Sequence, residues 1–239
     1  SAQRTAAWAD VARLIAHEIK NPLTPIQLSA ERLKRKYLSL ITVEQDLFIS
    51  LTETISRQVA DIGRMVDEFS SFARMPAAKL ASNDLKKIIE SQITLHTGAN
   101  SNIDFHLETQ NGPLLVLCDD HQIRQMFTNL IQNSIDSITA RGNNGYLDKG
   151  IVEIKSSIKS NFCHLKIIDN GIGLPPESSN RLTEPYVTTR EKGTGLGLAI
   201  VAKIVEDHGG ILKIQDVSEQ QSGAVVTVTI PLVETENSK

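Results

Sequence analysis

The sequence has little of several things that would each indicate a particular class of protein. Its 239 residues include two cysteines and 4 % aromatic residues, and the formal net charge is only −3. Cys118 and Cys163 stand singly, without a CxxC or Cys/His spacing. We therefore expect buried thiols rather than a disulfide or a metal site. A nearly neutral chain has no general basic field for a polyanion, so nucleic acid is a poor partner.

Long apolar runs are also missing. The longest are a few residues, far short of the ~20 that span a bilayer, and the N-terminal SAQRTAAWAD lacks a signal-peptide pattern. The content of 40 % hydrophobic and 22 % charged residues is ordinary for a globular protein. We expect a soluble chain of one large domain or two smaller ones, at roughly 150 residues per domain.

Two apolar stripes at helical spacing occupy the N-terminal part. The first consists of Val11, Ile15, Ile19, Pro22, Ile26, Ala30, Leu33 and Tyr37. The second consists of Phe48, Leu51, Ile55, Val59, Ile62, Val66, Phe69 and Ala73, and Pro76 marks its expected end. A hairpin of these two helices, joined near residues 39–45, cannot cover both stripes alone. We therefore expect a homodimer in which two hairpins form a four-helix bundle.

The pattern changes after Pro76. The small, polar segment 77–83 is typical of a linker. Beyond it, helices are predicted near 84–97, 120–139 and 196–208, and strands near 103–108, 113–118, 151–158, 162–168, 211–216 and 224–230. Because there is no strict βαβ repeat, we expect an α/β two-layer sandwich with a mixed or largely antiparallel sheet. The predicted parts are thus 1–76, 77–83 and 84–239.

His17 lies opposite the first apolar stripe, about 200° round the helix from Ile15. It should face water, with Asn21 one turn on and Glu18 next in sequence. An exposed neutral imidazole is a good nucleophile, and a neighbouring carboxylate can accept its ring proton as it attacks. The alternative is an ordinary solvated histidine beside an ordinary glutamate.

Pro22 and Pro25 follow His17 within the same pattern. A proline inside a helix costs about 3 kcal/mol, so the pair could separate two helices. Since the stripe continues in phase beyond them, we favour one kinked helix whose bend helps a second domain reach His17. Leu28 lies on the His17 face and is either part of a protein-docking surface or an isolated exposed leucine.

Four signals between residues 119 and 197 indicate a nucleotide site. Asn129 and Asn133 are i,i+4 neighbours with Asp136 a turn further along, and amide oxygens near one carboxylate suit a Mg²⁺ shared with substrate phosphates. Asp169 ends a strand and can accept a hydrogen bond from an exocyclic amine such as that of adenine. The glycines after it, Gly171 and Gly173, allow a flat ligand to approach the backbone closely. The alternatives are that the two asparagines are ordinary polar residues on a helix surface and that residues 169–171 form an ordinary turn.

The other two signals are a polar loop and a glycine run. Residues 181–192 could form a lid over phosphates, with two hydroxyls and two cations, Thr188, Thr189, Arg190 and Lys192. Gly193, Gly195 and Gly197 lead into a helix, whose free N–H groups can bind phosphate, although such a turn is also common in simple packing. The run matches neither a Rossmann nor a P-loop motif. Residues 208–210, His-Gly-Gly, are interpreted as a helix C-cap.

The order of these motifs resembles that of bacterial sensor histidine kinases of the NtrY nitrogen-regulation type. The string from His17 to Thr24 resembles the family's phosphoacceptor box, and residues 129–133 resemble its N box. Residues 169–173 and 193–198 resemble its two glycine boxes. Two departures stand out: Tyr186 and Arg190 must serve where the lid often has phenylalanines and a lysine, and Ser134, expected to be without effect, stands where alanine is usual.

The resemblance implies a fold and a set of roles. Residues 1–76 would be a dimerisation and histidine-phosphotransfer bundle, and residues 84–239 a Bergerat (GHKL) ATP-binding sandwich. His17 would take the γ-phosphoryl group with Glu18 as general base, and Asn21 would position water for dephosphorylation. Asn129 and Asn133 would hold Mg²⁺ and Asp169 would contact adenine. The other nucleotide-binding positions would be Asp136, Gly171, Gly173, Tyr186, Thr188, Thr189, Arg190, Lys192, Gly193, Thr194, Gly195, Leu196 and Gly197.

The implied function is that of a two-component kinase core. It would phosphorylate itself on His17 from Mg-ATP and pass the group to an aspartate of a response regulator, whose receiver domain docks near His17 and Leu28. The same core could dephosphorylate that regulator. The chain would be the cytoplasmic portion of a membrane-anchored bacterial protein. The alternative is an ATP-gated dimeric GHKL scaffold without autokinase activity, which would not need an exposed His17 beside Glu18.

Overall fold

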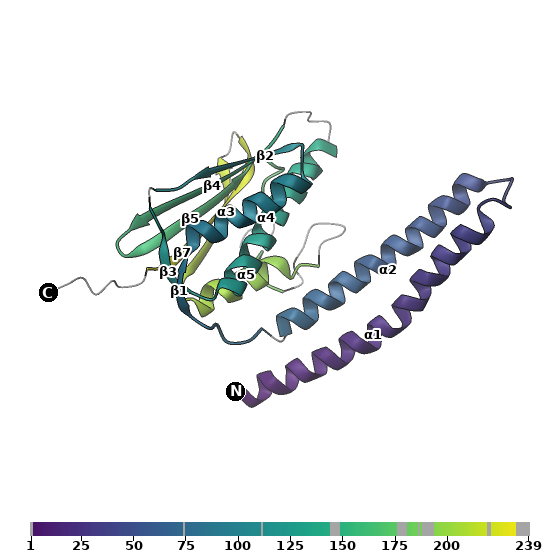
Figure 1. Ribbon diagram of the computed structural model, residues 1–239, viewed down its shortest axis with the longest axis horizontal. Coiled ribbons are helices and arrows are strands. Elements are labelled where there is room, and N and C mark those ends of the chain that lie inside the picture. Colours follow the sequence, from purple (N-terminus) through teal and green to yellow (C-terminus); the bar gives the residue numbers. More distant parts are fainter. Residues whose placement is uncertain are drawn as a thin grey trace. The chain divides into compact units, whose positions relative to one another are not determined.

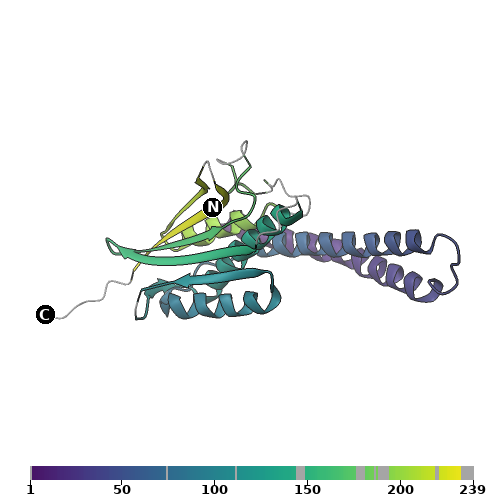
Figure 2. The same cartoon turned by 90° about the horizontal axis from the view of Figure 1, so that it is seen from above.

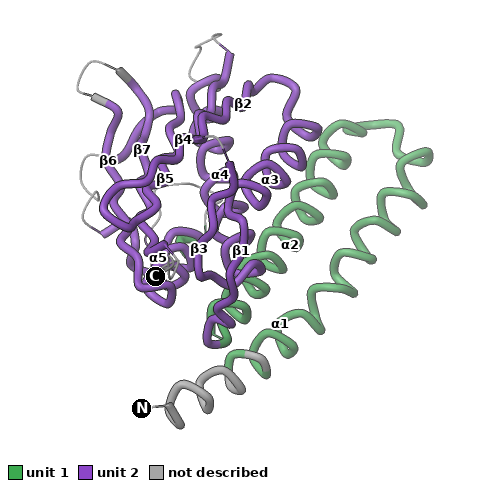
Figure 3. Tube along the Cα trace, turned by 60° about the vertical axis from the view of Figure 1, so that its left-hand side comes forward, with its two compact units in different colours: residues 1–76, 190–196 green, residues 77–189, 197–239 purple. Residues whose placement is uncertain are grey.

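The chain forms two compact units, one helical and one mixed. The computed structural model describes residues 2–73, 75–110, 112–143, 149–175, 181–185, 187, 194–218 and 221–232. The helical unit comprises residues 1–76 with 190–196, and the α/β unit comprises residues 77–189 with 197–239 (Figure 3). Within the described ranges, no helix is both long and apolar enough to cross a membrane.

The helical unit is a hairpin of two long helices, α1 (Ala2–Tyr37) and α2 (Gln45–Ala73), which lie side by side (Figures 1 and 2). Helix α1 runs without interruption through Pro22 and Pro25, which confirms the single continuous helix. Ion pairs between Lys20 and Asp67, and between Lys34 and Glu53 at 2.6 Å, link the two helices.

The seam of the hairpin is built from small and β-branched residues. Those buried in it are Ala12, Ala16, Ala30, Thr52, Val59, Val66 and Ser70. Most of the large residues of the two stripes are exposed instead: Ile15, Ile19, Ile26, Leu33, Tyr37, Leu51, Ile55 and Ile62. The expectation that one hairpin cannot cover its own apolar stripes is therefore confirmed.

In its described residues, the α/β unit contains a five-stranded sheet, a two-stranded sheet and three helices. Its elements are β1 (Ala81–Asp84), α3 (Leu85–Ala99), β2 (Ile103–Glu108), β3 (Leu115–Cys118), α4 (Asp120–Asn143), β4 (Gly150–Lys159), β5 (Phe162–Asp169), α5 (Gly197–Asp207), β6 (Ile211–Ser218) and β7 (Gln221–Pro231). The strand order is β2-β4-β5-β7-β6, in which only β2 and β4 pair in parallel. Helices α3, α4 and α5 cover one face (Figure 1). The predicted sandwich with a mixed sheet is confirmed.

The segment predicted as a linker ends in a strand. Residues 81–84 form β1, which pairs antiparallel with β3. Asp84 then caps α3, because its Oδ1 accepts a hydrogen bond from the backbone N–H of Lys86 (3.2 Å). The same oxygen also accepts one from Leu114 N–H (3.0 Å). Only residues 77–80 are left as an irregular connection. Propensity alone missed the strand, because its partner β3 is more than thirty residues away in the sequence.

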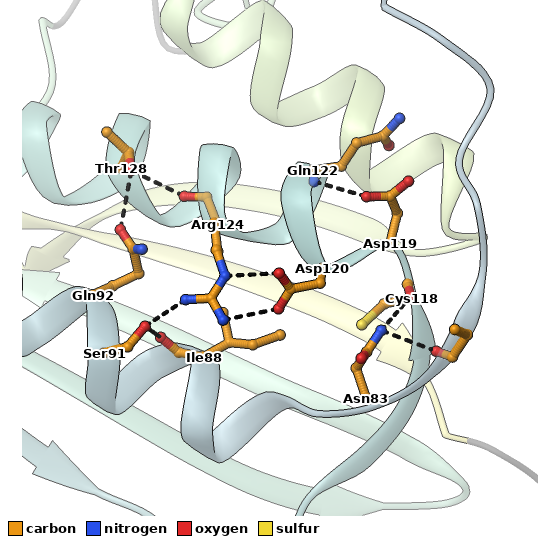
Figure 4. A network of polar contacts seen from close by, with 11 residues as sticks. Asn83, Ile88, Ser91, Gln92, Cys118, Asp119, Asp120, Gln122, Arg124 and Thr128 are labelled. Carbon is orange, nitrogen blue, oxygen red and sulfur yellow. Dashed lines mark hydrogen bonds and ion pairs between the residues drawn. The ribbon is translucent and has the colours of Figure 1, made fainter.

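Polar contacts fix helix α4 against α3 (Figure 4). Arg124 makes a bidentate ion pair with Asp120, at 2.8 and 2.9 Å, and also donates to the hydroxyl of Ser91 at 2.5 Å. Thr128 donates to Gln92 Oε1 at 3.0 Å. This network sets the position of the helix that carries Asn129 and Asn133.

The start of α4 and the end of α5 are joined by a buried histidine. Gly209 has a φ of +64°, and Gly210 N–H donates to Val205 C=O at 2.8 Å, which confirms the predicted C-cap. His208 Nε2 accepts a hydrogen bond from Asp119 N–H at 3.0 Å, and its Nδ1 lies 2.7 Å from Ile204 C=O. Because Nε2 is an acceptor, Nδ1 carries the ring proton.

Both cysteines are free and buried, as predicted. Burial raises the pKa of the Cys118 thiol to about 11 and that of the Cys163 thiol to about 12. Thiols in this state are not nucleophiles at neutral pH. The cysteines therefore serve as small core residues.

Candidate phosphoacceptor and nucleotide sites

His17 is exposed on α1, as its position opposite the apolar stripe predicts. Glu18 and Asn21 are exposed beside it. Leu28, on the same face, has 59 % of its surface accessible to solvent. Sequence reasoning did not identify Leu14 as a second exposed leucine on this face; it is 62 % exposed and lies one turn before His17. The spacing of residues 14, 17, 21 and 28 could have indicated it, because all four share one side of a helix.

Asn129, Asn133 and Asp136 lie on one side of α4, as their spacing predicts. The side-chain nitrogen of Asn129 is buried and has no hydrogen-bond partner within the described part of the chain. Asp136 Oδ1 accepts a hydrogen bond from Gln132 at 2.8 Å. A buried amide without a partner costs about 1–3 kcal/mol, which a bound polar ligand recovers.

The donor set of this region fits a metal ion only if a substrate supplies further ligands. Across the ranges that the structure describes, no three His, Cys, Asp or Glu side chains form a group able to hold a metal. Two amides and one carboxylate are a sparse oxygen set. Mg²⁺ is commonly held in this way, since it keeps several waters and shares substrate phosphates.

Asp169 is the last residue of β5 and faces the helices. The strand alternates, so that Cys163, Leu165, Ile167 and Asp169 all point to the covered side of the sheet and are buried. Its Oδ1 accepts a hydrogen bond from Gly171 N–H at 2.9 Å, and its Oδ2 accepts one from Ser134 at 3.3 Å. The prediction that a carboxylate is presented at the end of a strand is confirmed. Ser134, which was expected to be without effect, places its hydroxyl against this carboxylate, and that expectation stays untested.

The loop after Asp169 is anchored by three side chains. Asn170 accepts from Ile151 N–H (2.9 Å) and donates to Lys149 C=O (3.1 Å). The other two anchors are Ser137 Oγ, which accepts from Ile172 N–H at 3.1 Å, and Asp216 Oδ1, which accepts from Leu174 N–H at 2.8 Å. Sequence reasoning missed all of them. Only Asn170, inside the DNG turn, had a local signal.

Gly171 and Gly173 are needed for different reasons. A Cβ on Gly171 would lie 2.1 Å from Ser137 Oγ and 2.7 Å from its backbone carbon, so the absent side chain makes room for α4. The close approach of a flat ligand to the backbone at Gly171 stays a prediction. Gly173 has a φ of +81°, which favours glycine. The two glycines thus shape the loop that follows Asp169.

The predicted lid falls mostly outside the described residues, which do not include Tyr186, Thr188, Thr189, Arg190, Lys192 or Gly193. Thr194 Oγ1 accepts a hydrogen bond from Leu196 N–H at 3.2 Å, and Gly195 has a φ of +70°. Leu196 is buried, and α5 begins at Gly197. The glycine run therefore leads into a helix, as predicted. Its binding of phosphate stays a prediction.

Comparisons with known proteins give these parts a family. Residues 7–78 match the His Kinase A (phospho-acceptor) domain, and residues 118–234 match the histidine kinase-, DNA gyrase B-, and HSP90-like ATPase family. The nitrogen regulation protein NtrY of Azorhizobium caulinodans is 50 % identical over 235 residues. That match covers 96 % of this chain but 29 % of NtrY, so the chain spans under a third of that relative.

Solved structures agree with the sequence matches. The nucleotide-free catalytic domain of histidine kinase ThkA is 30 % identical, with a TM-score of 0.55, over 64 % of this chain and 95 % of that one. The complex of ThkA with the response regulator protein TrrA shares the fold, at 24 % identity and a TM-score of 0.67, over 98 % of this chain and 65 % of that one. The chain matches a phosphoacceptor domain followed by a kinase-type ATPase domain, and it is 50 % identical to NtrY over nearly its whole length. It therefore belongs to the sensor histidine kinases, as a core of the NtrY type.

Proposed function

We propose that this chain transfers the γ-phosphoryl group of Mg-ATP to His17 and then to an aspartate of a response regulator. The observation that carries the proposal is the exposure of His17 beside Glu18, on the side of α1 away from its apolar stripe. One ring nitrogen of His17 attacks the γ-phosphorus, the bond to the β-phosphate oxygen breaks, and ADP leaves. Glu18 accepts the proton from the other ring nitrogen. Positioning contributes most of the catalysis, since phosphoryl transfer needs little covalent assistance.

The nucleotide is assigned to residues 84–239. Asp169 accepts a hydrogen bond from the adenine amine, and the backbone N–H groups of residues 193–197 bind phosphate. Asn129 and Asn133 hold Mg²⁺, which neutralises phosphate charge when bound. The remaining contacts come from Asp136 and from the lid, with Tyr186 on the base. Thr188, Thr189, Arg190 and Lys192 reach the phosphates.

The domain plan and the partners follow from the same proposal. Residues 1–76 dimerise, residues 77–83 connect, and residues 84–239 bind ATP. The receiver domain of the regulator docks near His17 and Leu28, and Asn21 positions the water that dephosphorylates it. The chain is the cytoplasmic part of a protein whose other segments anchor it in a membrane.

If two hairpins form the bundle, an aspartate introduced on the apolar stripe should dissociate the dimer, whereas one introduced on the His17 face should not. Ile26, 46 % exposed, lies on the uncovered apolar stripe, whereas Leu28 lies on the His17 face. Burying an isoleucine contributes about 1.5–3 kcal/mol, and the change occurs twice per dimer. We expect Ile26→Asp to dissociate the dimer and Leu28→Asp to leave it intact, as measured by sedimentation equilibrium. The proposed bundle is wrong if Ile26→Asp remains a dimer at the same concentration.

Incubation with γ-labelled ATP and Mg²⁺ tests the activity itself. Phosphohistidine is labile in acid and stable in base, whereas phosphoserine and phosphothreonine are stable in acid. We expect acid-labile, base-stable label on the chain. ATP binding without such label would support the dimeric ATP-gated scaffold instead.

A further inference from the structure

The loop that follows β5 is held on one side by α4 and on the other by the edge strand β6. We propose that Asp216 on β6 is a positioning residue for the nucleotide site: by accepting the N–H of Leu174, it keeps residues 170–174 in the arrangement that binds ATP. This inference rests on the proposed function, which assigns ATP to the site that the loop borders. It adds a residue that lies outside the motifs of the sequence, and the way in which that residue acts.

Asp216 lies on the side of the sheet that carries the site. Strand β6 is at the edge of the five-stranded sheet, and β7 separates it from β5 (Figure 3). Leu212 is opposite Val228, which is opposite Leu165, so these three side chains share one side of the sheet with Asp169. Asp216 is four residues after Leu212 on the same strand, so its side chain lies on that side too.

The loop lies directly against β6 and β7. A Cβ on Gly173 would be 3.0 Å from Asp216 Oδ1 and 3.5 Å from the backbone nitrogen and oxygen of Gly223 on β7. A Cβ on Gly223 would be 2.0 Å from the backbone oxygen of Asp169. Because no side chain stands between the loop and these strands, the hydrogen bond from Leu174 N–H to Asp216 Oδ1, at 2.8 Å, holds the loop backbone to β6 itself.

Leu174 is the last residue through which this end of the loop can be held in this way. Residues 175 and 176 are prolines, which have no N–H. The other end is bound to α4, where Ser137 Oγ accepts from Ile172 N–H at 3.1 Å. Without the acceptor on Asp216, the loop can adopt further arrangements, and the measured ATP affinity falls with the fraction of chains that stay competent to bind.

Asp216→Ala removes this acceptor from an exposed position, so no buried side chain is lost. We expect ATP affinity to fall about twofold to tenfold, the range that corresponds to one hydrogen bond. The ATP concentration for half-maximal phosphorylation should rise by the same factor, while the maximal rate is kept because saturating ATP selects the competent arrangement. Amide hydrogen exchange in residues 170–174 should become faster.

Two further variants separate positioning from a general loss of structure. Asp216→Asn keeps a side-chain oxygen that can accept the same N–H, and it should restore the affinity, the half-maximal concentration and the exchange rate. Gln215→Ala is the matched control, because Gln215 is the exposed neighbour on the opposite side of β6. It should change none of the three quantities.

Isothermal titration with Mg-ATP, labelling kinetics and hydrogen-exchange mass spectrometry make the test. The inference is wrong if Asp216→Ala speeds exchange in the loop but binds ATP as tightly as the unaltered chain. It is equally wrong if Asp216→Asn binds ATP as weakly as Asp216→Ala, since the acceptor would then not be what matters. Absence of ATP binding by the unaltered chain would instead overturn the proposed function, and this inference with it.

Discussion

Replacing His17 with glutamine is expected to abolish phosphorylation of the chain while leaving its affinity for ATP unchanged. The imidazole is the nucleophile in the proposed reaction, and a carboxamide is not nucleophilic enough to replace it. His17 is exposed on α1, so the change removes no buried contact and the hairpin should keep its stability. Acid-labile label per chain and calorimetric ATP binding measure the two halves of this prediction.

His106 on β2 provides the matched control, since it is also an exposed histidine. We expect His106→Gln to take up label at the rate of the unaltered chain. Acid-labile label that persists in His17→Gln at a comparable rate would place the phosphoacceptor elsewhere. A loss of ATP binding in His17→Gln would show that the substitution acts on the nucleotide site instead of on the transfer.

Replacing Asp169 with asparagine is expected to lower ATP affinity about tenfold to a hundredfold. The amide keeps the shape, and its oxygen can still accept the hydrogen bond from Gly171 N–H. Its NH₂ group, however, turns a donor towards the amine of adenine. Losing a hydrogen bond to a charged acceptor costs about 1.5–3 kcal/mol, and 1.36 kcal/mol is a factor of ten.

The kinetic pattern separates base recognition from chemistry. Because Asp169 is assigned to the base and not to the reacting phosphate, the ATP concentration for half-maximal phosphorylation should rise while the maximal rate is kept. Asp104→Asn on β2, which breaks the ion pair of Asp104 with Lys149, should change neither. An Asp169→Asn chain with normal ATP affinity would remove Asp169 from the nucleotide site.

The local periodicity of apolar residues was sufficient to predict much of the fold. The phase of the apolar stripe across Pro22 and Pro25 predicted one continuous helix, and α1 is continuous. The same stripe predicted only part of the seam of the hairpin: it contains the buried Ala30 but not Ala12 and Ala16, which are also buried. Hydrophobicity marks large residues, whereas close approach of two helices selects small ones. The large residues of the stripes stay exposed, because a single hairpin has no surface to cover them.

The site shows the same division between local and distant signals. Asp169 at a strand end and the glycine run before α5 were predictable, because turn chemistry and strand patterns are local. The contacts of Ser134, Ser137 and Asp216 were not, since each partner lies 35 or more residues away in the sequence. The packing of Gly171 against α4 could not be predicted for the same reason. Long-range pairing, which periodicity does not contain, gives these residues their roles.

Tandem mass spectrometry of the chain after reaction with Mg-ATP, with digestion and separation kept at alkaline pH, locates the transferred group directly. The account predicts an added phosphoryl group on the peptide that contains residues 14–20, with fragment ions that place it on His17. It would be contradicted by an unmodified His17 in a chain that has bound ATP, or by a phosphoryl group found only on serine, threonine or another histidine.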